Sequence, residues 1–185
     1  IEVVAEGALD GLVERVRALD DVRERPEPPG FRGQLRPYQA RGLAWLDTLT
    51  RLGLGALLAD DMGLGKSVQV IAWLLETRGQ LIGPALLVCP TSVLGNWQRE
   101  ISRFAPCIKV VRHHGPGRSR TPEALVGGLG SGDVLLTTYS HLRADVAVLS
   151  KLPLGAFILD EAHHLKNPAS LQAQAARKIR APARI

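Results

Sequence analysis

Residues 60–67, which read Asp-Asp-Met-Gly-Leu-Gly-Lys-Ser, have the composition of a loop that binds nucleotide phosphates. The apolar run 55–59 precedes this loop and a helical pattern follows it, so the loop would join a strand to a helix. Its glycines allow backbone N–H groups and the positive end of the helix dipole to face an anion. Lys66 would then contact the β and γ phosphates, and the Ser67 hydroxyl would be a ligand of Mg²⁺. The alternative is a glycine-rich turn before a buried helix.

Two carboxylates, Asp160 and Glu161, directly follow the apolar run 157–159. Carboxylates at the end of a buried strand cost free energy unless a cation meets them, and a Mg²⁺–phosphate complex would supply one. Asp160 would hold Mg²⁺ through water, because this ion keeps much of its hydration shell. Glu161 would orient and deprotonate a water that attacks the γ-phosphorus. The alternative is a solvated acidic turn that caps the next helix.

Apolar runs alternate with helical patterns after residue 30, and these elements must position both groups of residues. The runs are nearly all apolar, as expected for strands of a parallel sheet that is buried on both faces. We predict a doubly wound α/β fold, with a mostly parallel sheet, helices on both faces and ligands beyond the carboxyl ends of the strands. The expected strands are 55–59, 85–89, 108–112, 134–138 and 156–159, and the expected helices are 38–51, 66–77, 94–104, 122–129, 141–149 and 168–179.

The beginning of the chain differs from the rest. Residues 1–25 have an amphipathic helical pattern with leucines and valines on one stripe, and residues 26–30 (Pro-Glu-Pro-Pro-Gly) predict a linker. We expect the first segment to be the tail of a preceding region and residues 31–185 to be the domain that holds the site. The chain begins with Ile1 and its one methionine is Met62, so we expect it to be part of a longer protein.

Composition limits the class of protein. Of the 185 residues, 45% are hydrophobic and 22% are charged, which is typical of a soluble globular domain. No apolar run is long enough to span a bilayer, and two cysteines are too few for a disulfide framework, so we expect a cytoplasmic location and no membrane partner. The net charge of +5 permits a polyanionic partner, whereas an aromatic content of 4% argues against a stacking platform for single strands.

Three runs together, 35–39 (Leu-Arg-Pro-Tyr-Gln), 60–67 and 160–163 (Asp-Glu-Ala-His), resemble the Swi/Snf-type ATPases of helicase superfamily two. The likeness covers residues 31–185 and the first of the two RecA-like lobes of that family, a P-loop NTPase fold. Asp60 stands where the usual phosphate-loop pattern has its first glycine, but an aspartate is usual there in this family. Ser67 stands where threonine is commoner, and both residues supply a hydroxyl.

The resemblance implies ATP and Mg²⁺ as cofactors. It implies Lys66 and Glu161 as catalytic residues, and Ser67 and Asp160 as the residues that hold the metal. A glutamine amide has a donor and an acceptor, so Gln39 would bind the adenine edge through both, unless it faces solvent beside a proline that starts a helix. His163 would link the nucleotide state to the second lobe. The nucleotide-binding residues implied in this way are Arg36, Gln39, Met62, Gly63, Leu64, Gly65, Lys66 and Ser67.

Several segments suit the phosphates of a nucleic acid. Residues 90–92 offer hydroxyls and N–H groups at a helix start, although Ser92 could instead cap that helix and Trp97 is expected in the core. The loop 112–120 holds three arginines, which would neutralise phosphates in a salt-sensitive manner, and its two histidines make a poor zinc site. The alternative without a binding function is that this loop is a mobile, solvated segment.

Other candidate contacts have weaker support from the residues alone. Thr137 and Thr138 end an apolar run, but threonine is also a good strand residue. Asn167 before Pro168 has the pattern of a helix N-cap, so Lys166 is assigned to the duplex only by the resemblance. The nucleic-acid contacts implied by the resemblance are Pro90, Thr91, Ser92, His114, Gly115, Arg118, Thr137, Thr138 and Lys166.

The sequence therefore predicts the ATP-binding lobe of an ATP-dependent translocase or remodelling ATPase on double-stranded DNA. The second lobe supplies an arginine finger in this family, and such a finger contributes roughly 10³–10⁵ in rate, so we expect little hydrolysis by these residues alone. The expected partners are double-stranded DNA, the second RecA-like lobe of the same chain, and a nucleoprotein or RNA polymerase. The expected location is the cytoplasm, in association with the nucleoid.

Two alternatives stay open. One is an RNA-directed helicase of the same superfamily, in which the run Asp-Glu-Ala-His also occurs. The other is a nucleotide-binding regulatory module without catalysis, which would recruit a partner such as RNA polymerase. Stimulation by RNA rather than duplex DNA would favour the first, and an unchanged cellular function of Glu161→Gln would favour the second.

Overall fold

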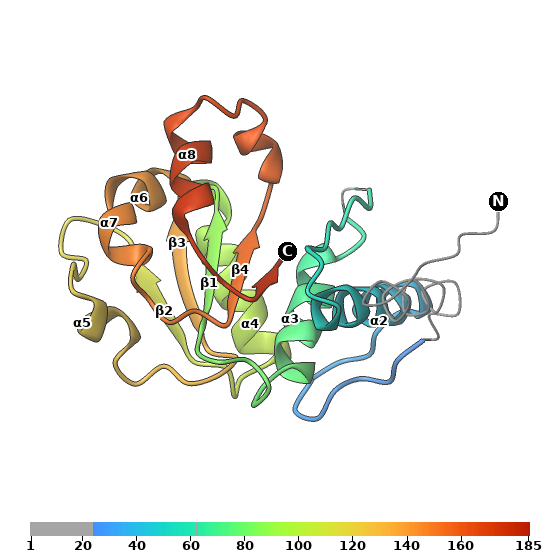
Figure 1. Cartoon of the computed structure of the whole chain (residues 1–185). Coiled ribbons are helices and arrows are strands. Elements are labelled where there is room, and N and C mark those ends of the chain that lie inside the picture. The colour runs from blue at the N-terminus through green and yellow to red at the C-terminus, as the bar shows by residue number, and fades with distance from the viewer. Residues whose placement is uncertain (1–23, 62) are drawn as a thin grey trace, which may run out of the picture.

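A five-stranded parallel sheet forms the centre of the computed structural model, which describes residues 24–61 and 63–185 (Figure 1). The strands lie in the order β2-β3-β1-β4-β5, and every neighbouring pair is parallel. Their bounds are β1 (Ala85–Cys89), β2 (Val110–His113), β3 (Val134–Thr138), β4 (Ala156–Leu159) and β5 (Ala183–Arg184). Because β1 lies between β3 and β4, the chain winds in both directions from the middle of the sheet.

The register brings the carboxyl ends of the central strands to one edge. Cys89 at the end of β1 lies opposite Thr138 at the end of β3, and Val88 lies opposite Leu159 at the end of β4. The residues that follow these strands are therefore neighbours, as is usual for binding sites in parallel α/β sheets.

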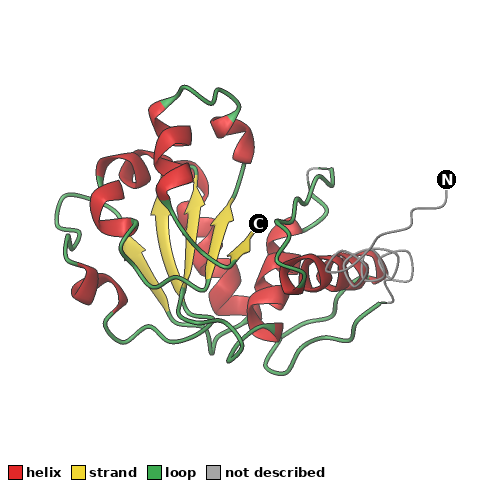
Figure 2. Cartoon of the chain, viewed as in Figure 1, coloured by secondary structure: helices red, strands yellow, loops and turns green. Residues whose placement is uncertain are grey.

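Helices cover both faces of the sheet (Figure 2). One hydrophobic core joins α3 and α4 to alternate residues of β1 such as Leu87, and α2 packs outside α3. A second core joins α6, α7 and α8 to the intervening residues Leu86 and Val88. The helices are α2 (Pro37–Arg51), α3 (Lys66–Glu76), α4 (Leu94–Phe104), α5 (Pro122–Val126), α6 (Tyr139–Ala144), α7 (Val146–Leu149) and α8 (Leu171–Lys178), with single 3₁₀ turns η3 (Thr91–Val93) and η4 (Ala162–Leu165).

Most of the expected elements are confirmed, and the strand predicted at 55–59 is wrong. That segment has no strand structure and makes one backbone hydrogen bond to β5, from Ala56 N to Arg184 O at 2.9 Å. One such bond is not the ladder of hydrogen bonds that makes a strand, so the apolar pattern alone does not decide the structure of this segment. The sequence did not predict β5, and the helix expected at 141–149 is broken at Asp145 into α6 and α7.

The segment before α2 lies against the domain. The Arg25 guanidinium forms ion pairs of 2.8 Å with the buried Asp47 carboxylate on α2 and with Glu76 on α3. The Phe31 ring stacks on Phe104 with 5.7 Å between ring centroids. The helix predicted for residues 1–25 falls outside the described residues, apart from its last two. In the part of the chain that the structure describes, no helix is long and apolar enough to cross a membrane.

Candidate nucleotide and nucleic-acid site

Residues 63–67 form a tight loop that opens helix α3. Gly63 and Gly65 have left-handed backbones, with φ of 86° and 73°, which a residue with a side chain adopts only at a cost. A Cβ at Gly65 would also lie 2.6 Å from the Gln39 side-chain nitrogen. Lys66, the first residue of α3, donates its ammonium to the carbonyls of Asp60 at 2.7 Å and Asp61 at 3.0 Å. The loop opens a helix as predicted, but no strand precedes it, and Met62 lies outside the described residues.

Gln39 braces this loop from helix α2. Its side chain is 7% exposed, its Oε1 accepts from Arg36 N at 3.0 Å, and its Nε2 donates to Leu64 O at 3.1 Å. Arg36 is exposed at the start of α2. Each of these bonds uses one of the two hydrogens of Nε2 or one of the two lone pairs of Oε1, so the amide keeps one donor and one acceptor position. The adenine role of Gln39 stays a prediction.

Asp160 is fixed at three atoms as the chain leaves β4. Its backbone N donates to Val88 O at 2.9 Å, and its backbone O accepts from the Tyr139 hydroxyl at 2.6 Å. Its carboxylate Oδ2 accepts from the Trp97 indole at 2.7 Å. Burial raises the pKa of Tyr139, as does the nearby Asp160 charge, so this hydroxyl remains a donor across the physiological range.

Glu161 is the one residue other than glycine with a left-handed backbone among residues 24–61 and 63–185, at φ 55°. Its side chain is exposed and lies 3.1 Å from His163 Nδ1. A left-handed conformation costs a residue with a Cβ about 1–2 kcal/mol, and such strain persists only where the surroundings impose it. The three anchors of Asp160 hold the preceding residue in place and account for this conformation.

A cavity of about 600 Å³ joins the two halves of the predicted nucleotide site. Its wall includes Lys66 and Ser67 from the phosphate loop and Asp160, Glu161 and His163 from the end of β4. In the described part of the chain, no three His, Cys, Asp or Glu side chains gather as in an all-protein metal site. The Ser67 hydroxyl and the Asp160 carboxylate would suit Mg²⁺, which takes most of its oxygen ligands from water and phosphates, and the Lys66 ammonium would suit the phosphates themselves.

Cys89 is the last residue of β1, and its thiol is a poor candidate for a nucleophile. Its side chain is fully buried, and burial raises the pKa of its thiol to about 12, with a further contribution from the Asp160 charge. The thiol donates to Thr137 O at 3.7 Å. A protonated thiol is a weak nucleophile, so Asp160 and Glu161 stay the candidates for chemistry at this edge of the sheet.

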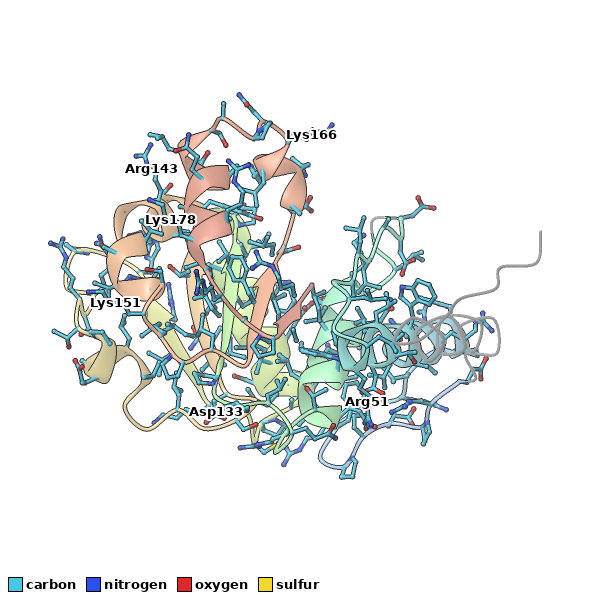
Figure 3. The ribbon with its side chains drawn as sticks, viewed as in Figure 1. Arg51, Asp133, Arg143, Lys151, Lys166 and Lys178 are labelled. Carbon is cyan, nitrogen blue, oxygen red and sulfur yellow. The ribbon has the colours of Figure 1, made fainter. Side chains whose placement is uncertain are left out.

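The candidate nucleic-acid residues differ in whether their polar groups are exposed or are buried and hydrogen-bonded within the protein. Thr91 and Ser92 are exposed in η3, next to Pro90, and Lys166 lies at the outer end of η4 and projects from the fold (Figure 3). Thr137 and Thr138, in contrast, are buried. The Thr137 hydroxyl donates to His113 O at 2.9 Å, and the Thr138 hydroxyl lies 2.7 Å from His141 Nδ1.

Arg118 of the basic loop is bound within the protein. It contacts the Asp145 carboxylate at 2.5 and 3.1 Å, donates to Gly115 O at 2.8 Å, and is 11% exposed. His113 Nε2 lies 2.8 Å from the same carboxylate. Burial opposes ionisation of Asp145, but the hydrogen bonds from Arg118 and His113 outweigh it and lower its pKa. Arg118 therefore holds the loop that contains His114 and Gly115, and its contact with phosphate stays a prediction.

Sequence reasoning missed four residues that hold this site together: Gln69, Trp97, Tyr139 and Asp145. Trp97 is buried as expected, but its bond to Asp160 joins residues 63 positions apart. Gln69 on α3 is fully buried and donates to Asp60 Oδ2 at 3.2 Å. A polar residue inside an apolar helical stripe was the available signal for Gln69, since buried amides need partners.

Three comparisons with known proteins bear on this site. Residues 38–185 match the family model described as the SNF2-related domain. The chain is 42% identical over 174 residues to the candidate ATP-dependent helicase/translocase YwqA of Bacillus subtilis, which is 93% of this chain and 19% of that protein. It is 39% identical over 165 residues to Helicase SWR1 of Debaryomyces hansenii, which is 88% of this chain and 10% of that protein.

The fold also matches a solved structure, the SWI2/SNF2 ATPase core of Sulfolobus solfataricus in complex with double-stranded DNA. The TM-score is 0.76 at 37% identity, over 86% of this chain and 32% of that chain. This match confirms the expected RecA-like α/β fold. The chain spans about a fifth of the length of YwqA and about a third of the solved ATPase core.

Proposed function

This chain belongs to the SNF2-related domain family, and we propose that it is the ATP-binding lobe of a motor that moves along double-stranded DNA. The observation that carries the proposal is the cavity shared by Lys66, Ser67, Asp160 and Glu161. These side chains supply a phosphate-binding cation, a metal-binding hydroxyl, a metal-binding carboxylate and a base. Lys66 and Ser67 open α3, and Asp160 and Glu161 directly follow β4.

Each of these side chains has a distinct task in the proposed reaction. Lys66 exchanges the carbonyls of Asp60 and Asp61 for the β and γ phosphate oxygens of ATP, which are better partners for an ammonium. Ser67 would hold Mg²⁺ directly and Asp160 would hold it through water. Bound Mg²⁺ neutralises charge on the phosphates. Glu161 orients the attacking water and accepts its proton at a carboxylate oxygen.

Duplex DNA is the proposed track. Residues 90–92 and 114–118 follow β1 and β2. Residues 137–138 are the last two of β3, and Lys166 lies in the turn after β4, so all of them are near the carboxyl edge of the sheet that also holds Asp160. The similarity to an ATPase core solved with double-stranded DNA supports this choice over RNA. Contacts of hydroxyls and arginines with phosphates do not distinguish one base from another, so the motor would bind DNA without sequence preference. A second RecA-like lobe would complete the site, and the location would be the cytoplasmic nucleoid.

The test is steady-state ATP hydrolysis by the full-length protein during a titration with duplex DNA, with RNA of equal length for comparison. We expect strong stimulation by the duplex and its loss in Lys66→Ala. Lys109→Ala is a matched control, because Lys109 also donates its ammonium to a backbone carbonyl, that of Gly128 at 2.9 Å, but does not line the cavity. Greater stimulation by RNA would favour an RNA-directed helicase, and none by either would favour a regulatory module.

A further inference from the structure

Two of the bonds that fix Asp160 come from elements that follow candidate nucleic-acid segments. Trp97 belongs to α4, which continues from the turn Thr91–Val93, and Tyr139 opens α6 directly after Thr138. We propose that Trp97 and Tyr139 are positioning residues that couple nucleic-acid binding to the metal-binding carboxylate of Asp160. This inference rests on the proposed function, since it assigns to that site a route by which the track acts on the nucleotide.

The Trp97 bond is short and goes to a carboxylate oxygen. Its Nε1 lies 2.7 Å from Asp160 Oδ2, at the short end of the range for charge-assisted N–H···O bonds. The indole is 5% exposed and α4 packs against the sheet and α3 through Leu94 and Ile101, so ring and helix move together. A shift of the turn Thr91–Val93 toward a phosphate would therefore change the position of the indole N–H relative to the carboxylate.

The Tyr139 bond fixes the backbone on the other side. Its hydroxyl donates to Asp160 O at 2.6 Å, and this carbonyl belongs to the peptide that leads into Glu161. Because Glu161 has the left-handed φ of 55°, its orientation depends on that peptide plane. Displacement of Tyr139 would thus change the orientation of Glu161, the proposed base. Displacement of Trp97 would change the orientation of the Asp160 carboxylate, the proposed metal ligand.

These bonds do more than satisfy buried donors. A buried indole N–H is satisfied by any acceptor, and Trp73 shows this, because its Nε1 donates to the Thr50 hydroxyl of α2 at 3.1 Å. Trp97 and Tyr139 instead converge from two helices on one residue of the cavity wall, by one bond to its carboxylate and one to its carbonyl. This convergence lets two segments far apart in the sequence act on the same residue.

The test measures linkage rather than turnover. In the full-length protein, the Kd for a fluorescent DNA duplex is measured without nucleotide and with Mg²⁺ and a non-hydrolysable ATP analogue. The ratio of the two constants is the coupling, and it must be reciprocal between the two ligands. Trp97→Phe and Tyr139→Phe keep the ring and remove the donor, and Trp73→Phe removes an indole N–H that does not contact Asp160.

We expect Trp97→Phe to bring the ratio about tenfold closer to one, the size of effect that loss of a hydrogen bond to a charged group produces. We also expect a higher Mg²⁺ concentration for half-maximal binding of the analogue. Tyr139→Phe should also bring the ratio closer to one. It should leave the Mg²⁺ concentration for half-maximal binding unchanged, because the Tyr139 bond goes to the backbone of Asp160 and not to its carboxylate. Trp73→Phe should leave both quantities unchanged, and thermal unfolding verifies that every variant is folded.

The outcomes separate the inference from the proposed function. A coupled wild-type protein whose ratio survives both Trp97→Phe and Tyr139→Phe, or falls equally in Trp73→Phe, overturns the inference and leaves the proposed function intact. A wild-type ratio of one also overturns the inference. A wild-type protein that binds no duplex overturns the proposed function, and the inference with it.

Discussion

The Asp60 carboxylate accepts a hydrogen bond of 3.2 Å from the Gln69 amide, and this contact ties the start of the phosphate loop to helix α3. Gln69 is fully buried, and α2 passes so close that a Cβ at Gly42 would lie 1.7 Å from Gln69 Oε1. An acid at position 60 in place of glycine thus has a physical reason. It supplies the acceptor that a buried amide needs, while the glycines at 63 and 65 supply the turns.

Gly42→Ala is expected to destabilise the domain by up to about 2 kcal/mol. The new methyl group overpacks against Gln69 and pushes its amide away from Asp60, which costs about 1–3 kcal/mol, and the better helix propensity of alanine offsets about 1 kcal/mol of that cost. Nucleotide affinity should fall as well, since the phosphate loop loses the hydrogen bond from Gln69 to Asp60. Urea unfolding and fluorescent-nucleotide binding measure the two effects.

The control for this change is Gly95→Ala on α4, where a Cβ would meet one side-chain atom at 3.6 Å. Alanine is better than glycine within a helix by about 1 kcal/mol, so Gly95→Ala should be neutral or stabilising. A Gly42→Ala protein that is as stable as the wild type would show that Gln69 can move without cost.

Glu161 allows a separation of backbone strain from chemistry. Glu161→Gly and Glu161→Ala both remove the proposed base and should lower ATP turnover by roughly 10²–10⁴ in the full-length protein. Glycine adopts a φ of 55° without a clash of its Cβ, so Glu161→Gly should be more stable than Glu161→Ala by about 1 kcal/mol. Equal stability in thermal unfolding would mean that the left-handed conformation relaxes in the alanine variant.

The predictable part of this molecule is local, and the rest depends on contacts across the chain. The strands 85–89, 134–138 and 156–159 were predictable because each is a short apolar run with clear ends. The run 55–59 has the same character but makes one backbone hydrogen bond to β5, and a strand exists only by a ladder of such bonds. Likewise Lys66 and Glu161 can be recognised as candidate site residues from their residue types and spacing. The bond from Trp97 to Asp160, in contrast, joins residues 63 positions apart and forms only in the folded sheet.

The stability of the domain should fall on mild acidification because of His113. Burial lowers the pKa of this imidazole, and the attraction of Asp145 does not offset that effect. The unfolded chain therefore binds a proton near pH 6.5 that the folded domain takes up only at lower pH. Stability is complete above pH 6.5 and decreases as the pH falls from there toward the lowered pKa.

His113→Gln keeps a side-chain amide that can donate to Asp145 and removes the titration, so its stability should change less between pH 7.5 and pH 5.5. Urea midpoints at a series of pH values measure this difference. His164→Gln is the control, because His164 is exposed. An equal pH dependence in His113→Gln and the wild type would place the effect on other groups, among them His141, whose pKa is also lowered by burial.

Arg25 should contribute to stability although it precedes the proline-rich segment. Its guanidinium pairs with the Asp47 carboxylate, which is fully buried, and with Glu76. Removal of the guanidinium in Arg25→Ala leaves Asp47 with Arg51 as its other partner, 52% exposed, and we expect a loss of about 2 kcal/mol in urea unfolding. Arg41→Ala is the matched control, because its pair with Glu24 is exposed on both sides and such pairs contribute about 0–1 kcal/mol. Equal losses in the two variants would mean that Arg25 acts as an ordinary surface residue and that residues 24–30 are a linker outside the cooperative unit.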